Sequence, residues 1–354
     1  MRRFIAIAML IAFAAGGAHA EVKWETGSWD DILAAAKKEN RHIFIDFYTV
    51  WCGPCKRLDK ITYQDAGVTE FTNTMLNVKY DCEKGFGEEL ADHYKIAAYP
   101  TLMVIGPDGK EVDRYVGYLD PEPFIETIKG YTEGIGTQAS YLAQLEKDPD
   151  NVELLLTVGT KYADAVMPED AEATLKRAME LDPEDKLEKR AENYYNLGNS
   201  YYAADDYEPA KKWFVKLIDE YGDTEWYAYG ERRLAYVNHK LGNNKEAVAG
   251  YYKLVELKPD DAGTLNGFAW FCSQRSIGLD QALPVALKAV EVSDRDPGIL
   301  DTLAEVYYAQ GDFDNALKIG QEALKSDPED TYFQDQVEKY KKAKAEADAQ
   351  ASLR

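Results

Sequence analysis

Apolar and polar residues follow two different patterns along this chain, and the change falls near residue 132. Before that point, short apolar runs alternate with amphipathic stretches, which is typical of strands alternating with helices. After it, apolar residues recur with the helical period and strand patterns are absent. The sequence therefore predicts an α/β part followed by an all-α part.

The first part begins with a predicted helix and a predicted central strand. Ser28 can cap a helix that extends through residue 40, with Asp30 and Asp31 in its first turn. Residues 42–48 form a nearly continuous apolar run, as a strand buried on both faces requires. The elements expected after them are a helix from residue 52, a helix over 68–75, a strand over 76–81, a hairpin of strands 102–105 and 111–118 around Gly106-Pro107-Asp108-Gly109, and a last helix opened by Pro121.

Two cysteines follow the predicted central strand in residues 51–56, Trp-Cys-Gly-Pro-Cys-Lys. Three positions apart on one helical turn, Cys52 and Cys55 lie on the same face, close enough to form a disulfide. At a helix N-terminus, free N–H groups and the helix dipole favour the thiolate of Cys52. Pro54 fits the first helical turn, because the N–H that it lacks would have no partner within the helix. We therefore expect a redox-active pair in which Cys52 is the exposed, low-pKa thiol and Cys55 the buried one.

Half of a zinc site is the alternative interpretation of this pair. A zinc site normally needs a second Cys or His pair at similar spacing, and His42, His93 and His239 are isolated. The two remaining cysteines, Cys82 and Cys272, are far apart in sequence and are expected to be buried, inert thiols. No phosphate-binding loop or nucleophile elbow is present.

The residues around the cysteines resemble the thioredoxin family over residues 22–132. The resemblance rests on residues 45–56, on Ala98-Tyr99-Pro100-Thr101-Leu102 and on residues 109–117. It implies that Cys52 attacks a disulfide, that Cys55 resolves the mixed disulfide, and that a buried Asp46 handles the proton. It also implies a cis-proline at Pro100 facing the disulfide, a lysine at Lys79 near the aspartate, and supporting roles for Trp51, Gly53, Pro54 and Tyr99.

Within that family, residues 62–80 and 99–101 are most similar to the periplasmic thiol:disulfide interchange branch. Two positions depart from the family pattern. Tyr48 stands where tryptophan is usual, and Tyr99 stands before the proline where a smaller residue is usual. The second change bears on substrate fit and on redox potential.

The second part of the chain contains an internal repeat. Small residues recur 39, 37, 34 and 35 residues apart, and each is followed by an alanine 12 or 13 residues later: Gly159/Ala171, Gly198/Ala210, Ala235/Ala247, Ala269/Ala282 and Ala304/Ala316. A fixed pair of small residues at this period indicates two closely crossing helices in each unit and resembles the tetratricopeptide repeat. The third and fourth units fit less well, because Glu231 replaces an apolar residue and Asp294 the terminal proline.

Tetratricopeptide arrays generally hold partner segments in a groove lined by the first helix of each repeat. Six residues fall on groove-facing positions, and their aromatic and amide character suits a peptide or protein partner: Tyr195, Asn199, Tyr202, Arg232, Tyr236 and His239. Packing between helices is the alternative role for each of them. After residue 331, Tyr332, Phe333, Val337 and Tyr340 can form a capping helix, with a solvated or frayed end from residue 341.

The N-terminus has the pattern of a secretory signal peptide. Arg2 and Arg3 precede an apolar run, and Ala18-His19-Ala20 offers a cleavage site. The net charge of −22, or −24 without that segment, argues against nucleic acid and anionic lipid as partners. No later run is long enough to cross a membrane.

These expectations combine into one interpretation: an α/β thioredoxin-like domain followed by an all-α tetratricopeptide solenoid. The expected parts are a signal peptide in 1–20, the thioredoxin-like domain in 21–132, a linker or helix in 133–150, about five repeats in 151–330, and a capping helix and tail in 331–354. The expected function is an extracytoplasmic, periplasmic-type thiol–disulfide oxidoreductase acting as a reductase or isomerase. Its expected partners are protein disulfides, a membrane electron donor, and a segment bound by the repeats, with no cofactor, metal or nucleic acid. The alternative is a non-catalytic scaffold in which the first domain only supports binding.

Overall fold

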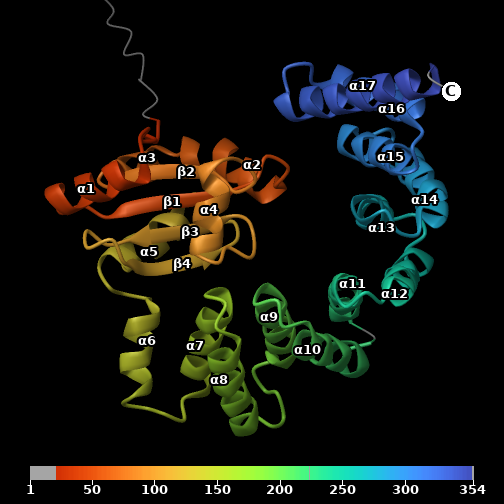
Figure 1. Cartoon of the computed structure of the whole chain (residues 1–354). Helices are drawn as coiled ribbons and strands as arrows, with labels where there is room; N and C mark the ends of the chain where they lie inside the picture. The colour runs from red at the N-terminus through yellow and green to blue at the C-terminus, as the bar shows by residue number, and fades with distance from the viewer. Residues whose placement is uncertain (1–20, 223, 353–354) are drawn as a thin grey trace, which may run out of the picture. The chain divides into compact units, whose positions relative to one another are not determined.

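The computed structural model describes residues 21–222 and 224–352, so the predicted signal peptide lies outside the described residues. The chain divides into two compact units, residues 21–90 with 98–137 and residues 91–97 with 138–352. An α/β part is followed by a long succession of helices (Figure 1), which confirms the predicted fold class.

A four-stranded sheet forms the centre of the first unit, in the order β2-β1-β3-β4. Its strands are β1 (Ile43–Tyr48), β2 (Leu76–Asp81), β3 (Thr101–Ile105) and β4 (Glu111–Val116). β1 pairs in parallel with β2 and antiparallel with β3, which forms the predicted hairpin with β4. The nearly continuous burial of β1 confirms it as a central strand.

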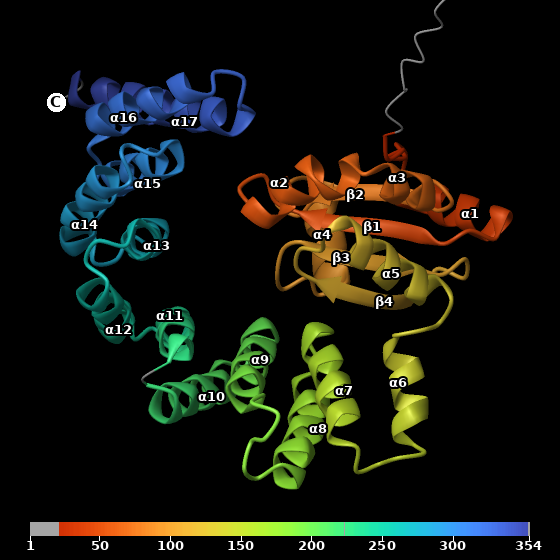
Figure 2. The same cartoon turned by 180° about the vertical axis from the view of Figure 1, so that it is seen from behind.

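Helices cover both faces of this sheet. The elements are α1 (Trp29–Glu39), α2 (Gly53–Lys60), the 3₁₀ turn η1 (Thr62–Gln64), α3 (Ala66–Thr72), α4 (Phe86–His93) and α5 (Pro121–Thr132). Phe44 of β1 packs with Leu58 of α2 and Phe124 of α5 in one core. On the other face, Phe47 of β1 contacts Tyr80, whose ring meets Phe86 of α4. Figures 1 and 2 accordingly show α4 and α5 on opposite sides of the sheet.

Local capping explains where the helices begin. Ser28 caps α1 by accepting a hydrogen bond from the backbone of Asp31, as predicted. The helix expected over residues 68–75 instead spans residues 66–72, because Asp65 accepts hydrogen bonds from the two N–H groups of its first turn. Helix α4 was not predicted, because it has only eight residues and its apolar side chains are too few to indicate a helical period from sequence.

The second unit consists of helices from α6 (Gln138–Leu145) onward. Five helix pairs follow, and each second helix packs on the first of its pair. The pairs are α7 (Val152–Asp164) with α8 (Pro168–Leu181), α9 (Arg190–Ala203) with α10 (Tyr207–Glu220), α11 (Glu225–Lys240) with α12 (Asn244–Leu257), α13 (Ala262–Arg275) with α14 (Leu279–Val292), and α15 (Pro297–Ala309) with α16 (Phe313–Ser326).

The small residues of the repeat permit the close crossing within each pair. A Cβ atom on Gly159 would lie 2.5 Å from the side chain of Leu175, and one on Gly198 would lie 2.6 Å from Phe214. Since real Cβ atoms do not approach so closely, these glycines let the two helices pack directly. Ala235, Ala269 and Ala304 hold the same place in the later pairs and are buried.

Helix α17 (Thr331–Ser352) covers the last pair. Val337 and Tyr340 are buried as predicted, and the Tyr340 ring packs against Gly320. The end from residue 341 is solvated, as expected, because its side chains are mostly exposed. It does not fray but continues the helix to Ser352, as its alternating lysine, alanine and acidic residues permit.

Two buried carboxylates hold α17 against α15. Asp301 and Glu305, each 4% exposed, lie one turn apart on α15. Asp301 accepts a hydrogen bond of 2.8 Å from the Tyr332 hydroxyl, and Glu305 accepts one of 2.6 Å from the Tyr340 hydroxyl. Lys339 forms an ion pair with Glu305. Burial, reinforced by the charge of Glu305, raises the pKa of Asp301 to about 6.

The docking of α17 should therefore weaken as the pH rises. Because the folded pKa of Asp301 exceeds its unfolded value, the folded chain binds this proton more tightly than the unfolded chain. The resulting stabilisation is fully present below about pH 4 and is lost as the pH rises through 6, by about 3 kcal/mol at most. Hydrogen exchange of α17 amides, corrected for intrinsic rates, should show this loss of protection. In Asp301→Asn the dependence should flatten, and an unchanged dependence in this variant would contradict the assignment.

Candidate active site

The two cysteines stand at the start of α2, where the chain leaves β1. Cys52 is the N-cap residue and its sulfur accepts a hydrogen bond of 3.1 Å from the backbone N–H of Cys55. Gly53 and Pro54 form the first turn. Cys52 and Cys55 are joined by a disulfide, with their Cα atoms 5.2 Å apart. The predicted pairing and the predicted helix start are both confirmed.

The expected difference in exposure between the two cysteines is absent in this disulfide form. Cys52 is 3% exposed and Cys55 is 1% exposed, so the expectation of an exposed Cys52 is wrong for the oxidised chain. The cause is the cap geometry, which turns the sulfur of Cys52 back toward the N–H of Cys55. That N–H also remains available to a thiolate once the disulfide is reduced.

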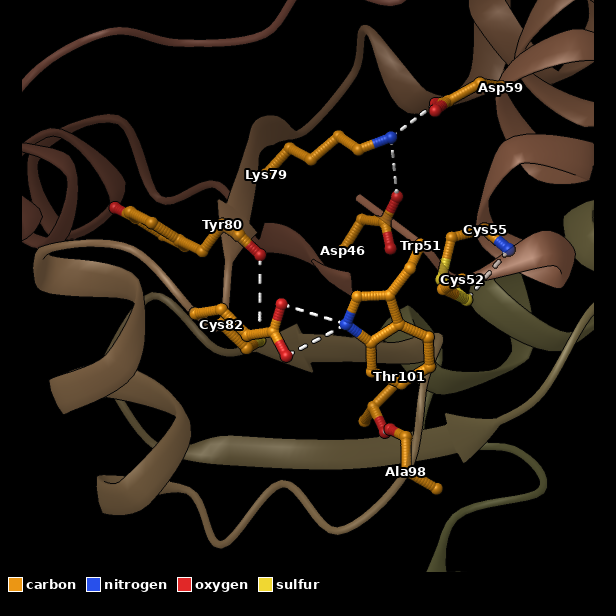
Figure 3. Close-up of a disulfide and its surroundings, with 11 residues drawn as sticks. Asp46, Trp51, Cys52, Cys55, Asp59, Lys79, Tyr80, Cys82, Ala98 and Thr101 are labelled. Carbon is orange, nitrogen blue, oxygen red and sulfur yellow. Dashed lines mark hydrogen bonds and ion pairs between the residues drawn. A yellow bond between two sulfur atoms is a disulfide. The ribbon is translucent and has the colours of Figure 1, made fainter. Parts of the chain in front are cut away.

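Asp46 lies fully buried in the middle of β1. It is two residues from Phe44, so its side chain points to the face on which α2 packs. Its register partner on β2 is Lys79, whose Nζ lies 3.3 Å from the carboxylate. Lys79 also forms an ion pair with Asp59 of α2, as Figure 3 shows by the two dashed lines from its amino group. The lysine thus links the buried aspartate to the helix that begins at the cysteines.

The protonation of this group is set by burial. Burial raises the pKa of Asp46, and the charge of Lys79 opposes that increase without cancelling it. The Lys79 amine also loses hydration, which lowers its pKa, but Asp46 and Asp59 outweigh this and raise it overall. Burial beside Asp46 raises the pKa of the Tyr63 hydroxyl well above its usual value. Asp46 can therefore exchange a proton at a pH closer to neutral than an ordinary aspartate can.

Tyr48, which replaces the usual tryptophan of the family pattern, lies over the same lysine. Lys79 Nζ is 4.6 Å from the centre of the Tyr48 ring. An aromatic face at this distance attracts a cation. The tyrosine therefore helps to hold Lys79 between the two carboxylates.

The loop before β3 carries the predicted proline. The peptide bond between Tyr99 and Pro100 is cis, as the family resemblance implied. The Tyr99 ring meets Trp51 edge to face, with ring centres 6.0 Å apart. Trp51 is 51% exposed, and its indole N–H donates to both carboxylate oxygens of Glu83 at 2.9 Å (Figure 3). A fixed aromatic surface therefore borders the cysteines.

Three residues of this site were not predicted from the sequence: Asp59, Tyr63 and Glu83. Asp59 is one turn beyond Cys55 on the same face of α2, a spacing that could have identified it. Tyr63 and Glu83 reach the site only through the fold, and their sequence positions carry no such signal.

Neither remaining cysteine has the properties of a reactive thiol. Cys82 and Cys272 are free and buried, as expected. Burial raises the pKa of each thiol to about 12, so almost no thiolate forms near neutral pH. Within residues 21–222 and 224–352, no group of three or more His, Cys, Asp or Glu side chains is placed to hold a metal ion. None of the helices described combines the length and apolar character needed to cross a membrane.

The six residues expected to bind a partner lie on α9 and α11. Tyr195, Asn199 and Tyr202 are on α9, and Arg232, Tyr236 and His239 are on α11. All but the exposed Arg232 are partly buried, so each combines packing with some accessible surface. His239 is engaged locally, because its Nδ1 lies 2.8 Å from the Asn244 side-chain oxygen. Arg233 and Arg275 were not predicted; Arg233 contacts Tyr195 and Arg275 contacts Tyr236.

Comparisons with known proteins match the two parts of the chain separately. A family model described as a thioredoxin-like domain matches residues 29–131, and models described as tetratricopeptide repeats match residues 191–223, 233–261 and 297–330. The thioredoxin of Chlamydia trachomatis is 37% identical over 87 residues, which are 24% of this chain and 78% of that protein.

Longer relatives match over a smaller share of their length. The thiol:disulfide interchange protein DsbD of Pseudomonas fluorescens is 29% identical over 27% of this chain and 17% of its own length. The protein disulfide isomerase-like 2-2 of rice is 28% identical over 38% of this chain and 35% of its own. The chain therefore spans about a third or less of these two relatives.

Proposed function

Because this chain belongs to the thioredoxin family and carries tetratricopeptide repeats, we propose that it is a thiol–disulfide oxidoreductase whose repeats bind a client or partner protein. The observation that carries this proposal is the Cys52–Cys55 disulfide at the start of α2, on the sheet face where Asp46 is buried. A protein that only binds partners has no use for a paired dithiol beside a buried carboxyl group. We further propose that it works outside the cytoplasm, since the pattern in residues 1–20 is that of an export signal.

The first step of the proposed reaction is nucleophilic attack by Cys52. As a thiolate, its sulfur attacks one sulfur of a substrate disulfide, and the bond between the two substrate sulfurs breaks. The leaving substrate sulfur departs as a thiolate and takes a proton from solvent. The N–H of Cys55, which already donates to the Cys52 sulfur, favours the charged form. A mixed disulfide between Cys52 and the substrate results.

The second step is attack by Cys55 on the Cys52 sulfur. The Cys55 thiol must first lose its proton, and we assign that proton to the Asp46 carboxylate, whose raised pKa suits proton exchange. Attack breaks the mixed disulfide and releases the second substrate thiolate. The substrate disulfide has then gained two electrons, and Cys52 and Cys55 have lost them. A dithiol donor must reduce the pair again, and in an oxidising compartment we propose a membrane-borne donor.

Catalysed turnover of a protein disulfide tests this proposal against the scaffold alternative. The reduced chain should accelerate the reduction of insulin by dithiothreitol, because the dithiol supplies a faster route than the small thiol alone. A rate equal to that of dithiothreitol alone, from a chain whose Cys52 and Cys55 are shown to be reduced, would favour the scaffold.

The direction of electron flow follows from the two residues between the cysteines. Gly53 and Pro54 add no positive charge that would stabilise a thiolate, so the reduced pair should not be unusually favoured. We expect a reduction potential of roughly −270 to −200 mV, the range of thioredoxin and glutaredoxins, and hence a reductase or isomerase. Equilibration with glutathione buffers measures it. A potential near about −120 mV, that of a strong oxidant, would instead identify an oxidase.

A further inference from the structure

Three arginines gather on the first helices of the third and fourth repeat pairs. Arg232 and Arg233 are on α11, and Arg275 ends α13. They lie among three partly buried tyrosines, Tyr195 and Tyr202 of α9 and Tyr236 of α11. We call these six residues the arginine–tyrosine surface.

Two of the three tyrosines, Tyr195 and Tyr236, are in direct contact with an arginine. Arg233 donates from Nε to the Tyr195 hydroxyl at 3.2 Å. The Arg275 guanidinium carbon lies 4.4 Å from the centre of the Tyr236 ring. Such stacking holds a planar guanidinium in one orientation while leaving its edge available for hydrogen bonds. The surface is thus preorganised.

No carboxylate neutralises these arginines among the described residues. The other described arginines, Arg190 excepted, each form an ion pair with a carboxylate: Arg41, Arg57, Arg114, Arg177 and Arg295. Arg190 donates to backbone carbonyls instead. In a chain with 63 acidic and 41 basic residues, three neighbouring arginines without a carboxylate partner are unexpected.

Two acidic side chains close to this surface, Asp261 and Asp205, are engaged elsewhere. The charge of Arg232 contributes to the lowered pKa of Asp261, but this carboxylate caps α13 by accepting a hydrogen bond of 2.8 Å from the Thr264 N–H. Asp205, near Tyr202, accepts the Tyr207 hydroxyl. Neither carboxylate forms an ion pair with an arginine of the surface.

The electrostatic effect appears at Tyr195. Burial alone would raise the pKa of its hydroxyl, but the charges of Arg233 and Arg232 and the hydrogen bonds from Arg233 and Asn199 lower it overall. Two side-chain atoms at this surface are buried without a hydrogen-bond partner, Nε of Arg275 and Oδ1 of Asn199. An unmade hydrogen bond of this kind costs stability, which a bound ligand would recover.

We propose that the arginine–tyrosine surface binds an extended acidic segment of the client or partner polypeptide, with segment carboxylates on the three arginines. The tyrosine rings would pack against the intervening residues of the segment. This inference rests on the proposed partner-binding role of the repeats and adds the chemistry of the partner. A nucleic acid fits less well, because its many phosphates would meet the strongly acidic remainder of the chain.

Binding of labelled decapeptide pools to the full-length chain tests the inference. Three pools share their glycine, serine and leucine content and contain no cysteine, and their remaining positions are acidic (Asp and Glu), neutral (Asn and Gln) or basic (Lys). A chain of net charge −22 should attract the basic pool non-specifically, so a preference for the acidic pool requires a local site. By fluorescence anisotropy, the acidic pool should bind about tenfold or more tightly than the neutral pool, because hydrogen bonds to charged groups are the stronger ones.

Substitutions locate the site. Arg232→Gln, at an exposed position where folding should be unaffected, and Arg275→Gln should each weaken acidic-pool binding by about tenfold. The matched control is Arg177→Gln on α8. Arg177 already forms an ion pair with Asp150, so its loss should not change the binding of the acidic pool. The inference is overturned by equal binding of the acidic and neutral pools, by no binding of any pool, by arginine variants that bind normally, or by tighter arginine-dependent binding of a ten-nucleotide single strand. Reduction of insulin is measured in parallel. If peptide binding fails but insulin reduction persists, this inference is wrong while the proposed oxidoreductase activity stands.

Discussion

Replacing Cys52 by serine should abolish catalysed disulfide reduction and leave only the rate of the small-molecule thiol. A serine hydroxyl does not ionise near neutral pH and cannot form a disulfide, so neither step of the proposed reaction remains. Cys55→Ala should behave differently, because Cys52 can still attack and nothing can resolve the product. This variant should accumulate a mixed disulfide through Cys52, visible as a thiol-sensitive mass increase on non-reducing gels and in peptide mapping.

The other two cysteines provide matched controls. Cys82→Ser and Cys272→Ser each remove a thiol that is buried and has a pKa near 12, so neither should change turnover if the chain stays folded. Substantial turnover by Cys52→Ser, or a mixed disulfide mapped to Cys82 or Cys272, would contradict the assignment of Cys52 as nucleophile. The proteins trapped by Cys55→Ala in the native host would identify the clients.

Much of the first unit could be predicted because its signals are local. Ser28 caps a helix with its own neighbours, residues 43–48 are apolar enough to be a central strand, and Gly106 to Gly109 turn the chain within one hairpin. The cysteine pair is equally local, since one helical turn fixes its geometry. Lys79 was placed by family resemblance alone, and its contact with Asp46 arises from the register of two parallel strands.

The repeats illustrate both the reach of a sequence pattern and its limit. The spacing of small residues located all five helix crossings, because each crossing needs a small side chain at the point of contact. Glu231 weakened the pattern of the third unit, yet it is buried and forms an ion pair of 2.9 Å with Lys253 of the next helix. Its Oε1 also accepts a 2.9 Å hydrogen bond from the Tyr227 hydroxyl. A polar partner contributed by another helix thus replaced the expected apolar contact, and a one-dimensional pattern does not reveal such a replacement.

Contacts between elements account for most of what was missed. Glu83 follows β2 and holds Trp51, which precedes α2, so the contact depends on the position of the two chain segments at the sheet edge. Arg275 reaches Tyr236 from the next repeat pair, 39 residues away in sequence. Without a spacing rule, the sequence does not distinguish an arginine that is paired with a carboxylate from one that is not. Only their neighbours in three dimensions separate them.

Replacing Asp46 by asparagine should slow the resolving step while it makes the first unit more stable. An amide cannot accept the Cys55 proton, so resolution then depends on solvent, and loss of a positioned general base typically costs about 100-fold or more. In the wild-type chain the resolving rate should rise as the pH passes through the raised pKa of Asp46, and this rise should be absent in the variant. Stopped-flow measurement of the decay of a mixed disulfide between Cys52 and thionitrobenzoate follows the step directly.

The stability of the same variant provides an independent readout. Because burial raises the pKa of Asp46 in the folded state, the neutral carboxyl stabilises the fold at low pH, and this contribution is lost as the pH rises through that folded pKa. Asparagine never carries the charge, so above that pH Asp46→Asn should unfold at higher denaturant concentration than the wild-type chain. Lys79 keeps an ion-pair partner in Asp59 and is not left buried alone. Asp59→Asn is the matched control: it removes the other carboxylate at Lys79, and the pH-dependent step should persist because Asp46 remains. A resolving rate that falls equally in both variants would mean that Asp46 acts through Lys79 rather than as the proton acceptor.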